Sequence, residues 1–166
     1  MNIFLISNDP SLSLAKINQI AINPQDIVCL FNHANPIKFN KILEHKQKYL
    51  FLRYHNNSYW GLDQAIKYQK FYDKIIFINH NKESLEQAKN ILNTTIFINE
   101  SEYSTNTYPN NKYPTSGFVA YNYVLQICNN IFLVNFTGHG SRCEGWNKHD
   151  YIFEQQYYKA KSVVII

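Results

Sequence analysis

Seven short apolar runs, rich in β-branched and aromatic residues, recur along the chain at fairly even intervals and constrain its fold more than any other feature. They are NIFLIS (2–7), DIVCLF (26–31), YLFLRY (49–54), KIIFIN (74–79), TIFIN (95–99), IFLVNF (131–136) and SVVII (162–166). Each run is almost continuously apolar, which is typical of strands that are buried on both faces of a parallel sheet. The chain is therefore expected to form a sheet of six to seven mostly parallel strands.

Between most of these runs, apolar residues recur with the spacing that places them on one stripe of a helix. Such stripes occupy 12–20, 39–43, 62–71, 85–92 and 119–127. Strands that alternate with helices in this way form βαβ units. We therefore predict an α/β fold with a doubly wound, Rossmann-like sheet and helices on both faces. The 166 residues, of which 45% are apolar, suit a single domain over 1–166.

The charge and the cysteines exclude several classes of protein. The net charge is +4, but the basic residues are scattered, so a nucleic-acid-binding face is not expected. Mild positive charge suits an anionic small ligand or loose contact with a membrane surface. Three cysteines without a CxxC pair favour a reducing compartment. No signal peptide or membrane-spanning run is evident, so we expect a cytoplasmic protein, either free or peripheral at the inner face of the membrane.

Two segments interrupt the alternation of strands and helices. Residues 101–115 are polar, contain two prolines and show no period, and residues 137–148 hold three of the five glycines. Each segment follows a predicted strand and precedes a predicted helix. Because ligands of open α/β sheets bind beyond the carboxyl ends of the strands, we expect the chemistry of the protein in these loops.

Several common motifs are missing. The sequence contains no GxGxxG, no GxxxxGK[ST], no GxSxG and no DxD pair. His139, Cys143 and His149 could form a zinc triad, but a structural zinc site needs a fourth close ligand, which is not evident. We therefore predict neither a metal nor a cofactor.

Four short segments with polar residues stand in an order that suggests a nucleotide site. They are SNDPS (7–11) after the first strand, FNHAN (31–35) at the end of the second, PTSG (114–117) before a helix, and HDYIFE (149–154). The proline in the first segment suits a first helical turn, with Asn8 or Asp9 as the cap. Free backbone N–H groups at the start of the helix after Pro114 can hold a phosphate.

This set resembles the sialyltransferases of glycosyltransferase families 42 and 29. In bacterial members, a first strand is followed by G-N-G-P-S and a helix, a second strand ends in an asparagine, and T-S-G precedes a later helix. In the animal-type family, the catalytic histidine lies in an H-x4-E motif. Residues 53–113 are largely unmatched. The chain departs from the family in having Asp9 where glycine is usual and no tyrosine between Tyr123 and Tyr151.

The resemblance implies an inverting, metal-independent transfer of a sugar acid, sialic acid or a similar one, from a CMP-sugar donor to a surface glycan acceptor. His149 would be the general base, and His139 would stabilise the departing phosphate in place of the missing tyrosines. Glu154 completes the H-x4-E motif. The implied donor-binding residues are Asn8, Ser11, Asn32, Thr115, Ser116 and Gly117.

Each of these residues also has an ordinary structural explanation. His149 can be a helix-start histidine bonded to backbone, Glu154 a carboxylate that orients its helix, and Asn8 and Ser116 plain helix caps. Asn32 is the stronger candidate, because a polar side chain that ends a buried strand needs a partner. The alternative function is a non-catalytic or degenerate nucleotide- or carbohydrate-binding domain within a glycan-assembly complex.

Overall fold

The computed structural model describes residues 1–7, 12–32, 47–53, 66–67, 69–79, 95–109, 111–136, 149–161 and 163–166, and all statements below concern these residues. Its strands are β1 (Ile3–Ile6), β2 (Ile27–Phe31), β3 (Gln47–Arg53), β4 (Lys74–Asn79), β5 (Thr95–Asn99), β6 (Ile131–Val134) and β7 (Val164–Ile165). Its helices are α1 (Leu14–Asn18), the 3-10 turn η1 (Gln69–Phe71), α5 (Glu100–Tyr103), α6 (Ser116–Leu125) and α7 (Tyr151–Ala160).

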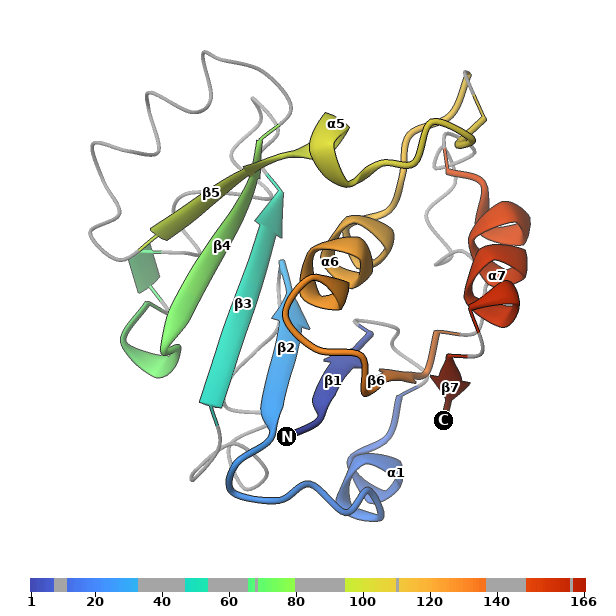
Figure 1. Ribbon diagram of the computed structural model, residues 1–166. Helices are drawn as coiled ribbons and strands as arrows, with labels where there is room; N and C mark the ends of the chain where they lie inside the picture. The colour runs from blue at the N-terminus through green and yellow to red at the C-terminus, as the bar shows by residue number, and fades with distance from the viewer. Residues whose placement is uncertain are drawn as a thin grey trace.

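The strands form one seven-stranded sheet in the order β5-β4-β3-β2-β1-β6-β7, and every neighbouring pair is parallel (Figure 1). In its centre, Ile3 of β1 is in register with Ile27 of β2 on one side and Ile131 of β6 on the other. The predicted Rossmann-like α/β fold is confirmed, and each of the seven apolar runs contains or overlaps a strand.

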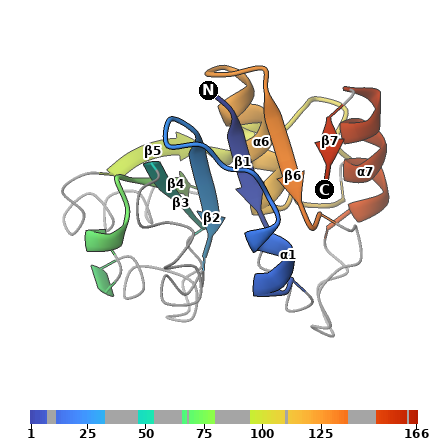
Figure 2. The same cartoon turned by 90° about the horizontal axis from the view of Figure 1, so that it is seen from below.

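The two faces of the sheet carry separate cores because successive side chains of a strand point to opposite sides. Ile3 and Leu5 of β1 belong to the core that α6 and α7 cover, whereas Phe4 and Ile6 belong to the core on the side of α1. Figure 2 shows α1 and α6 on opposite faces of the sheet. All four of these β1 side chains are buried, which explains why the strand sequences are continuously apolar.

The helices differ from the prediction in two places. Helix α1 begins at Leu14, and the Ser13 side chain accepts a hydrogen bond from Lys16 N, so Ser13 is its cap rather than Asn8 or Asp9. At the cap position, a side-chain oxygen accepts a hydrogen bond from an N–H of the first helical turn. Because the Ser13 hydroxyl does this, α1 begins directly after it. Residues 101–115 are not uniformly irregular, because α5 forms directly after β5. The expected helices at 39–43 and 85–92 lie outside the described residues, as do residues 62–65 and 68 of the helix expected at 62–71.

The order of the strands creates a switch point between β1 and β6, where the chain connections leave in opposite directions. From β1 the chain proceeds through α1 to β2 on one side, whereas β6 is reached from the far edge strand β5 through α6. The two strands meet closely at their carboxyl ends, where Ser7 N donates to the Val134 carbonyl at 3.1 Å. In open α/β sheets such a point is where ligands bind.

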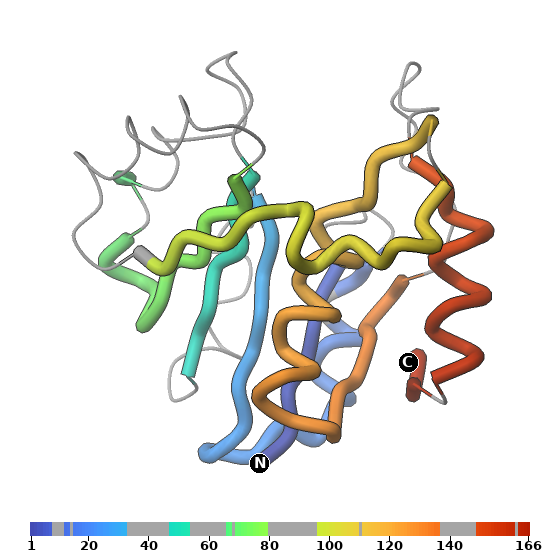
Figure 3. Tube along the Cα trace, turned by 45° about the horizontal axis from the view of Figure 1, so that its top comes forward, coloured from blue at the N-terminus to red at the C-terminus, as the bar shows by residue number. Residues whose placement is uncertain are grey.

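The chain between β5 and α6 makes a long excursion to α7 before it returns. Figure 3 shows this segment crossing toward the N-terminal end of α7. Tyr108 anchors it there: its ring packs edge-on against Phe118 of α6 and Phe153 of α7, with centroids 5.2 and 5.0 Å away. Among the described helices, none has the length and apolar character required to cross a membrane.

Candidate functional site

The carboxyl edge of the sheet carries a row of polar residues. One polar residue ends or directly follows each of six adjacent strands, namely Asn99 (β5), Asn79 (β4), Arg53 (β3), Asn32 (β2), Ser7 (β1) and Asn135 (β6). Because all the strands are parallel, these residues lie at one edge. This row, with the N-terminal ends of α6 and α7, is the candidate site. Because the chain contains 22 asparagines, any single one is weak evidence for a functional site. The row becomes evident only from the order of the strands in the sheet.

Asn32 lies where the sequence predicts it, at the end of β2, and its backbone is in the left-handed region with φ 44°. Asparagine tolerates this conformation better than most residues. Its side-chain oxygen accepts a hydrogen bond from Arg53 N at 3.0 Å, and its own N–H donates to the Phe51 carbonyl. Asn32 therefore has a structural partner for its oxygen, which joins the ends of β2 and β3.

Arg53 forms a buried ion pair that the sequence analysis does not single out. Its Nη2 lies 2.7 Å from Oε2 of Glu100, and the two side chains are 8% and 10% exposed. Burial lowers the pKa of Arg53, while the carboxylates of Glu100 and Glu154 oppose that effect. The signal that could have revealed it is an arginine at the end of an apolar strand, since a buried guanidinium requires a carboxylate or another acceptor.

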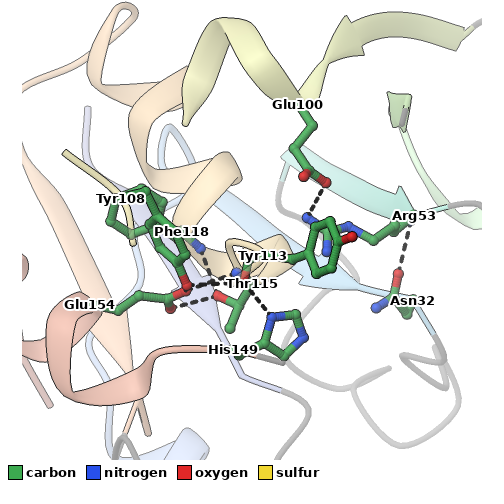
Figure 4. Close-up of polar contacts among 9 residues, drawn as sticks. All are labelled: Asn32, Arg53, Glu100, Tyr108, Tyr113, Thr115, Phe118, His149 and Glu154. Atoms are coloured by element: carbon green, nitrogen blue, oxygen red, sulfur yellow. Dashed lines mark hydrogen bonds and ion pairs between the residues drawn. The ribbon is translucent and has the colours of Figure 1, made fainter. Parts of the chain in front are cut away.

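The N-terminal end of α6 is held by Glu154 of α7 (Figure 4). The Thr115 side chain caps α6 by accepting from Phe118 N at 3.0 Å. Thr115 also donates twice to the Glu154 carboxyl, from its N–H at 2.8 Å and from its hydroxyl at 2.7 Å. The donors of Thr115 are thus used inside the protein. The first-turn N–H groups of Ser116 and Gly117 have no carbonyl acceptor four residues earlier within the helix, as for any helix start.

Gly117 is required by close packing at the switch point. A Cβ atom there would lie 2.5 Å from Cε1 of Phe136, the second residue after β6. The Phe136 ring packs edge-on against Phe31 of β2 and Tyr158 of α7, and Gln155 donates to its carbonyl. Phe136 thereby brings the ends of β2 and β6 and the start of α6 into one neighbourhood.

His149 lies just before α7 and faces the turn that precedes α6. Its Nδ1 is 2.6 Å from the carbonyl oxygen of Tyr113. A carbonyl can only accept, so Nδ1 carries the hydrogen, and in the neutral ring Nε2 is the basic nitrogen. The next residue, Asp150, caps α7 by accepting from Phe153 N at 2.9 Å. The Tyr113 carbonyl therefore selects the tautomer of the imidazole that suits a general base at Nε2.

Glu154 is almost completely buried and accepts from three donors, two on Thr115 and the hydroxyl of Tyr108 at 2.8 Å. Burial raises the pKa of Glu154 to about 7, against the hydrogen bonds from Thr115 and Tyr108 and the charge of Arg53. The carboxyl bonds the start of α6 instead of the His149 ring. The sequence analysis offers two functions for Glu154, a catalytic one and that of a carboxylate that orients its helix. These contacts are of the second, structural kind.

Three of the predicted site residues, Asn8, Ser11 and His139, lie outside the described residues, as does Cys143 of the hypothetical zinc triad. The structure does bring Asn32, Thr115, Ser116, Gly117, His149 and Glu154 to the carboxyl side of the sheet. Within the described ranges, no group of three His, Cys, Asp or Glu side chains lies close enough to hold a metal ion.

No protein-family model, curated protein or solved structure matches this chain. The function is therefore proposed from the geometry of its own residues together with the resemblance of its sequence motifs.

Replacing Gly117 with alanine should destabilise the protein by roughly 1–3 kcal/mol, because the new methyl group overlaps the packed Phe136 ring. Chemical denaturation measures this change, with Ser116→Ala as the neighbouring control that should stay within about 0.5 kcal/mol. Alanine is the better helix former by up to about 1 kcal/mol. A stabilised Gly117→Ala variant would therefore contradict the close approach.

The raised pKa of Glu154 predicts a pH dependence of stability. Between the ordinary value of 4.5 and about 7, the folded protein retains a proton that the unfolded chain has released. Wild type should therefore lose stability relative to Glu154→Gln as the pH rises through this window, and the difference should level off above it. Denaturation of both proteins at a series of pH values measures the effect. A gain by the wild type over the same window would show that the fold prefers the carboxylate.

Proposed function

We propose that this protein is an inverting, metal-independent glycosyltransferase of the sialyltransferase type, which transfers a sugar acid from a CMP-sugar to a surface glycan acceptor such as a capsule or lipooligosaccharide chain. The observation that carries the proposal is the setting of His149. Its Nδ1–H is bound by the Tyr113 carbonyl, and its ring stands beside the helix start that the resemblance assigns to the donor. We place the reaction in the cytoplasm, with the protein either free or peripheral at the inner face of the membrane.

In the proposed reaction, Nε2 of His149 takes the proton of an acceptor hydroxyl while that oxygen attacks the anomeric carbon of the donor. The new glycosidic bond forms as the bond from the anomeric carbon to the phosphate oxygen breaks, and CMP leaves with that electron pair. The Tyr113 carbonyl then stabilises the imidazolium through Nδ1–H.

The donor would be held by the carboxyl edge of the sheet. Ser116 and Gly117 would direct first-turn N–H groups toward the single phosphate, and Asn32 would contribute its amide N–H2. Asn8, Ser11 and His139 retain the roles that the resemblance implies for them. A CMP donor carries one phosphate, which needs less charge neutralisation than a diphosphate, in keeping with a sequence that has no DxD pair.

The second candidate function is a nucleotide- or carbohydrate-binding domain without catalysis, acting in a glycan-assembly complex. A specific observation favours it: the donors of Thr115 serve Glu154, and Gly117 is explained by the approach of Phe136. Both features of the T-S-G segment thus have an internal function that does not require a ligand.

Nucleotide binding provides the first test. The thermal unfolding temperature should rise with CMP in a concentration-dependent manner, as mass action requires for a ligand that binds only the folded state. UMP, AMP and GMP at the same concentrations are the controls and should have little effect. Equal shifts with all four nucleotides, or none with CMP, would contradict a CMP-sugar site.

Two variants separate catalysis from binding. His149→Ala should lower turnover by roughly 10²- to 10⁴-fold and leave CMP affinity nearly unchanged. Asn32→Asp keeps the acceptor for Arg53 N and tolerates the left-handed backbone, but it removes the amide donor. It should weaken CMP binding by roughly 1–3 kcal/mol. CMP release from CMP-sugar acids and calorimetry measure the two effects.

Ile152→Ala is the matched control, because this side chain lies on the first turn of α7 and is 73% exposed. It should change neither turnover nor affinity. If CMP binds but no CMP-sugar acid is turned over by any preparation, the binding domain is the correct alternative.

A further inference from the structure

The hydroxyl of Tyr108 lies between two acceptors that belong to different parts of the site. It is 2.8 Å from Oε1 of Glu154 and 3.0 Å from the carbonyl oxygen of Tyr113, and it accepts from Asp150 N at 3.3 Å. A phenol has one hydrogen, so it can donate to only one of these acceptors at a time. Burial and the Glu154 carboxylate raise the pKa of Tyr108 well above its usual range, so the hydroxyl keeps its hydrogen.

When Glu154 is ionised, the hydrogen bonds have one consistent arrangement. Oε1 accepts from the Tyr108 hydroxyl and from Thr115 N, and Oε2 accepts from the Thr115 hydroxyl. The Tyr113 carbonyl then receives the Nδ1–H of His149 without competition from Tyr108. A hydrogen bond to a charged oxygen is stronger than one to a neutral carbonyl, so Tyr108 turns to Glu154.

When Glu154 is protonated, its hydrogen is better placed on Oε1 than on Oε2. On Oε2 it would face the Thr115 hydroxyl, which already accepts from Phe118 N, and would displace the hydrogen that Thr115 donates. On Oε1 it faces the Tyr108 oxygen. The Tyr108 hydrogen must then turn to its other acceptor, the carbonyl of Tyr113.

We propose that Tyr108 is a positioning residue, which reports the protonation state of Glu154 to His149 by donating or not donating to the carbonyl of Tyr113. With two donors on one oxygen, each hydrogen bond is weaker than when the oxygen serves a single donor. An ionised Glu154 therefore leaves the Tyr113 carbonyl to His149, and Nε2 is then the better base. The inference deepens the proposed function and rests on it for the catalytic role of His149, whereas the hydrogen-bond exchange is a property of the fold.

Several other titratable or charged groups face Glu154 or its partners. They are Arg53 of β3 with Glu100 of α5, Tyr108 before α6, Tyr158 of α7, and His149 and Asp150 just ahead of that helix; the cap of α6 is the neutral Thr115. Arg53 stays charged throughout, and burial keeps Tyr158 protonated. Since burial raises the pKa of Glu154 to about 7, its proton is exchanged near neutral pH.

The exchange can be followed by NMR spectroscopy on the whole chain without any substrate. We expect the backbone carbonyl ¹³C resonance of Tyr113 to shift with pH. The midpoint of this shift should equal the midpoint at which the Glu154 carboxyl resonance titrates. In Tyr108→Phe, which keeps the ring packed against Phe118 and Phe153, the Glu154 resonance should still titrate, and the Tyr113 resonance should no longer follow it. Tyr103→Phe, a matched change outside these contacts, should behave as wild type.

Glu154→Gln provides a second measurement, because it removes the titrating group. The Tyr113 carbonyl resonance should then no longer show the pH-dependent shift that follows the Glu154 titration. The ¹⁵N resonances of the His149 ring should lose the same pH-dependent shift. A Tyr113 shift that still follows the Glu154 titration in Tyr108→Phe would overturn the proposal, since the coupling would act through space. A wild-type carbonyl that never follows Glu154 would overturn it as well. Loss of the glycosyltransferase function alone, with the coupled shifts present, would instead remove only the catalytic role of His149.

Discussion

A parallel sheet that is covered on both faces excludes polar side chains from the length of its strands, and the rest of this structure depends on that constraint. The strands β1 and β2 have no exposed side chain, so the first position for a polar group is where each strand ends. Because the strands are parallel, six such positions form one row at the carboxyl edge. The polar chemistry of the protein is therefore concentrated on one side of the sheet by the requirements of burial.

Polar groups that lie near this edge but away from water must bond to one another, and Glu154 is the centre of that bonding. Its carboxyl joins the start of α6 to the body of α7 through Thr115, and it holds the excursion before α6 through Tyr108. Losing any one donor would leave a buried oxygen with a weaker set of partners, which is costly in a low dielectric. The same contacts place the Tyr113 carbonyl opposite His149, so the packing that stabilises the two helices also orients the candidate base.

The internal contacts refine the meaning of the segments that resemble sialyltransferases. Thr115 and Gly117 have clear structural functions, and Asn32 has one for its side-chain oxygen. His149 bonds the Tyr113 carbonyl through Nδ1. Structural use and ligand binding are compatible at a helix start, since a capped helix still directs its first N–H groups outward. The imidazole tautomer is the feature on which the proposed catalytic role of this edge rests.

The sequence by itself determined the strands, because continuous apolar runs and their spacing follow from local burial on both faces. It also determined the polar end of β2 at Asn32, which is a local signal. It offered Ser116 as the cap of α6, but the helix begins at Ser116 and the Thr115 side chain caps it. It failed at the start of α1, which begins at Leu14 and is capped by Ser13, and at α5, a single turn that is too short to show a period.

Only the tertiary structure decided which polar groups meet. The bonds of Glu154 join residues 39 and 46 positions apart, and the bond of His149 spans 36 positions. The ion pair of Arg53 with Glu100 likewise joins the ends of β3 and β5, which are separated in the sheet by β4. No periodicity in the chain encodes such contacts, because they arise when the crossover from β5 brings α6 back over the sheet and the chain after β6 sets α7 against it, so that buried donors and acceptors must find partners.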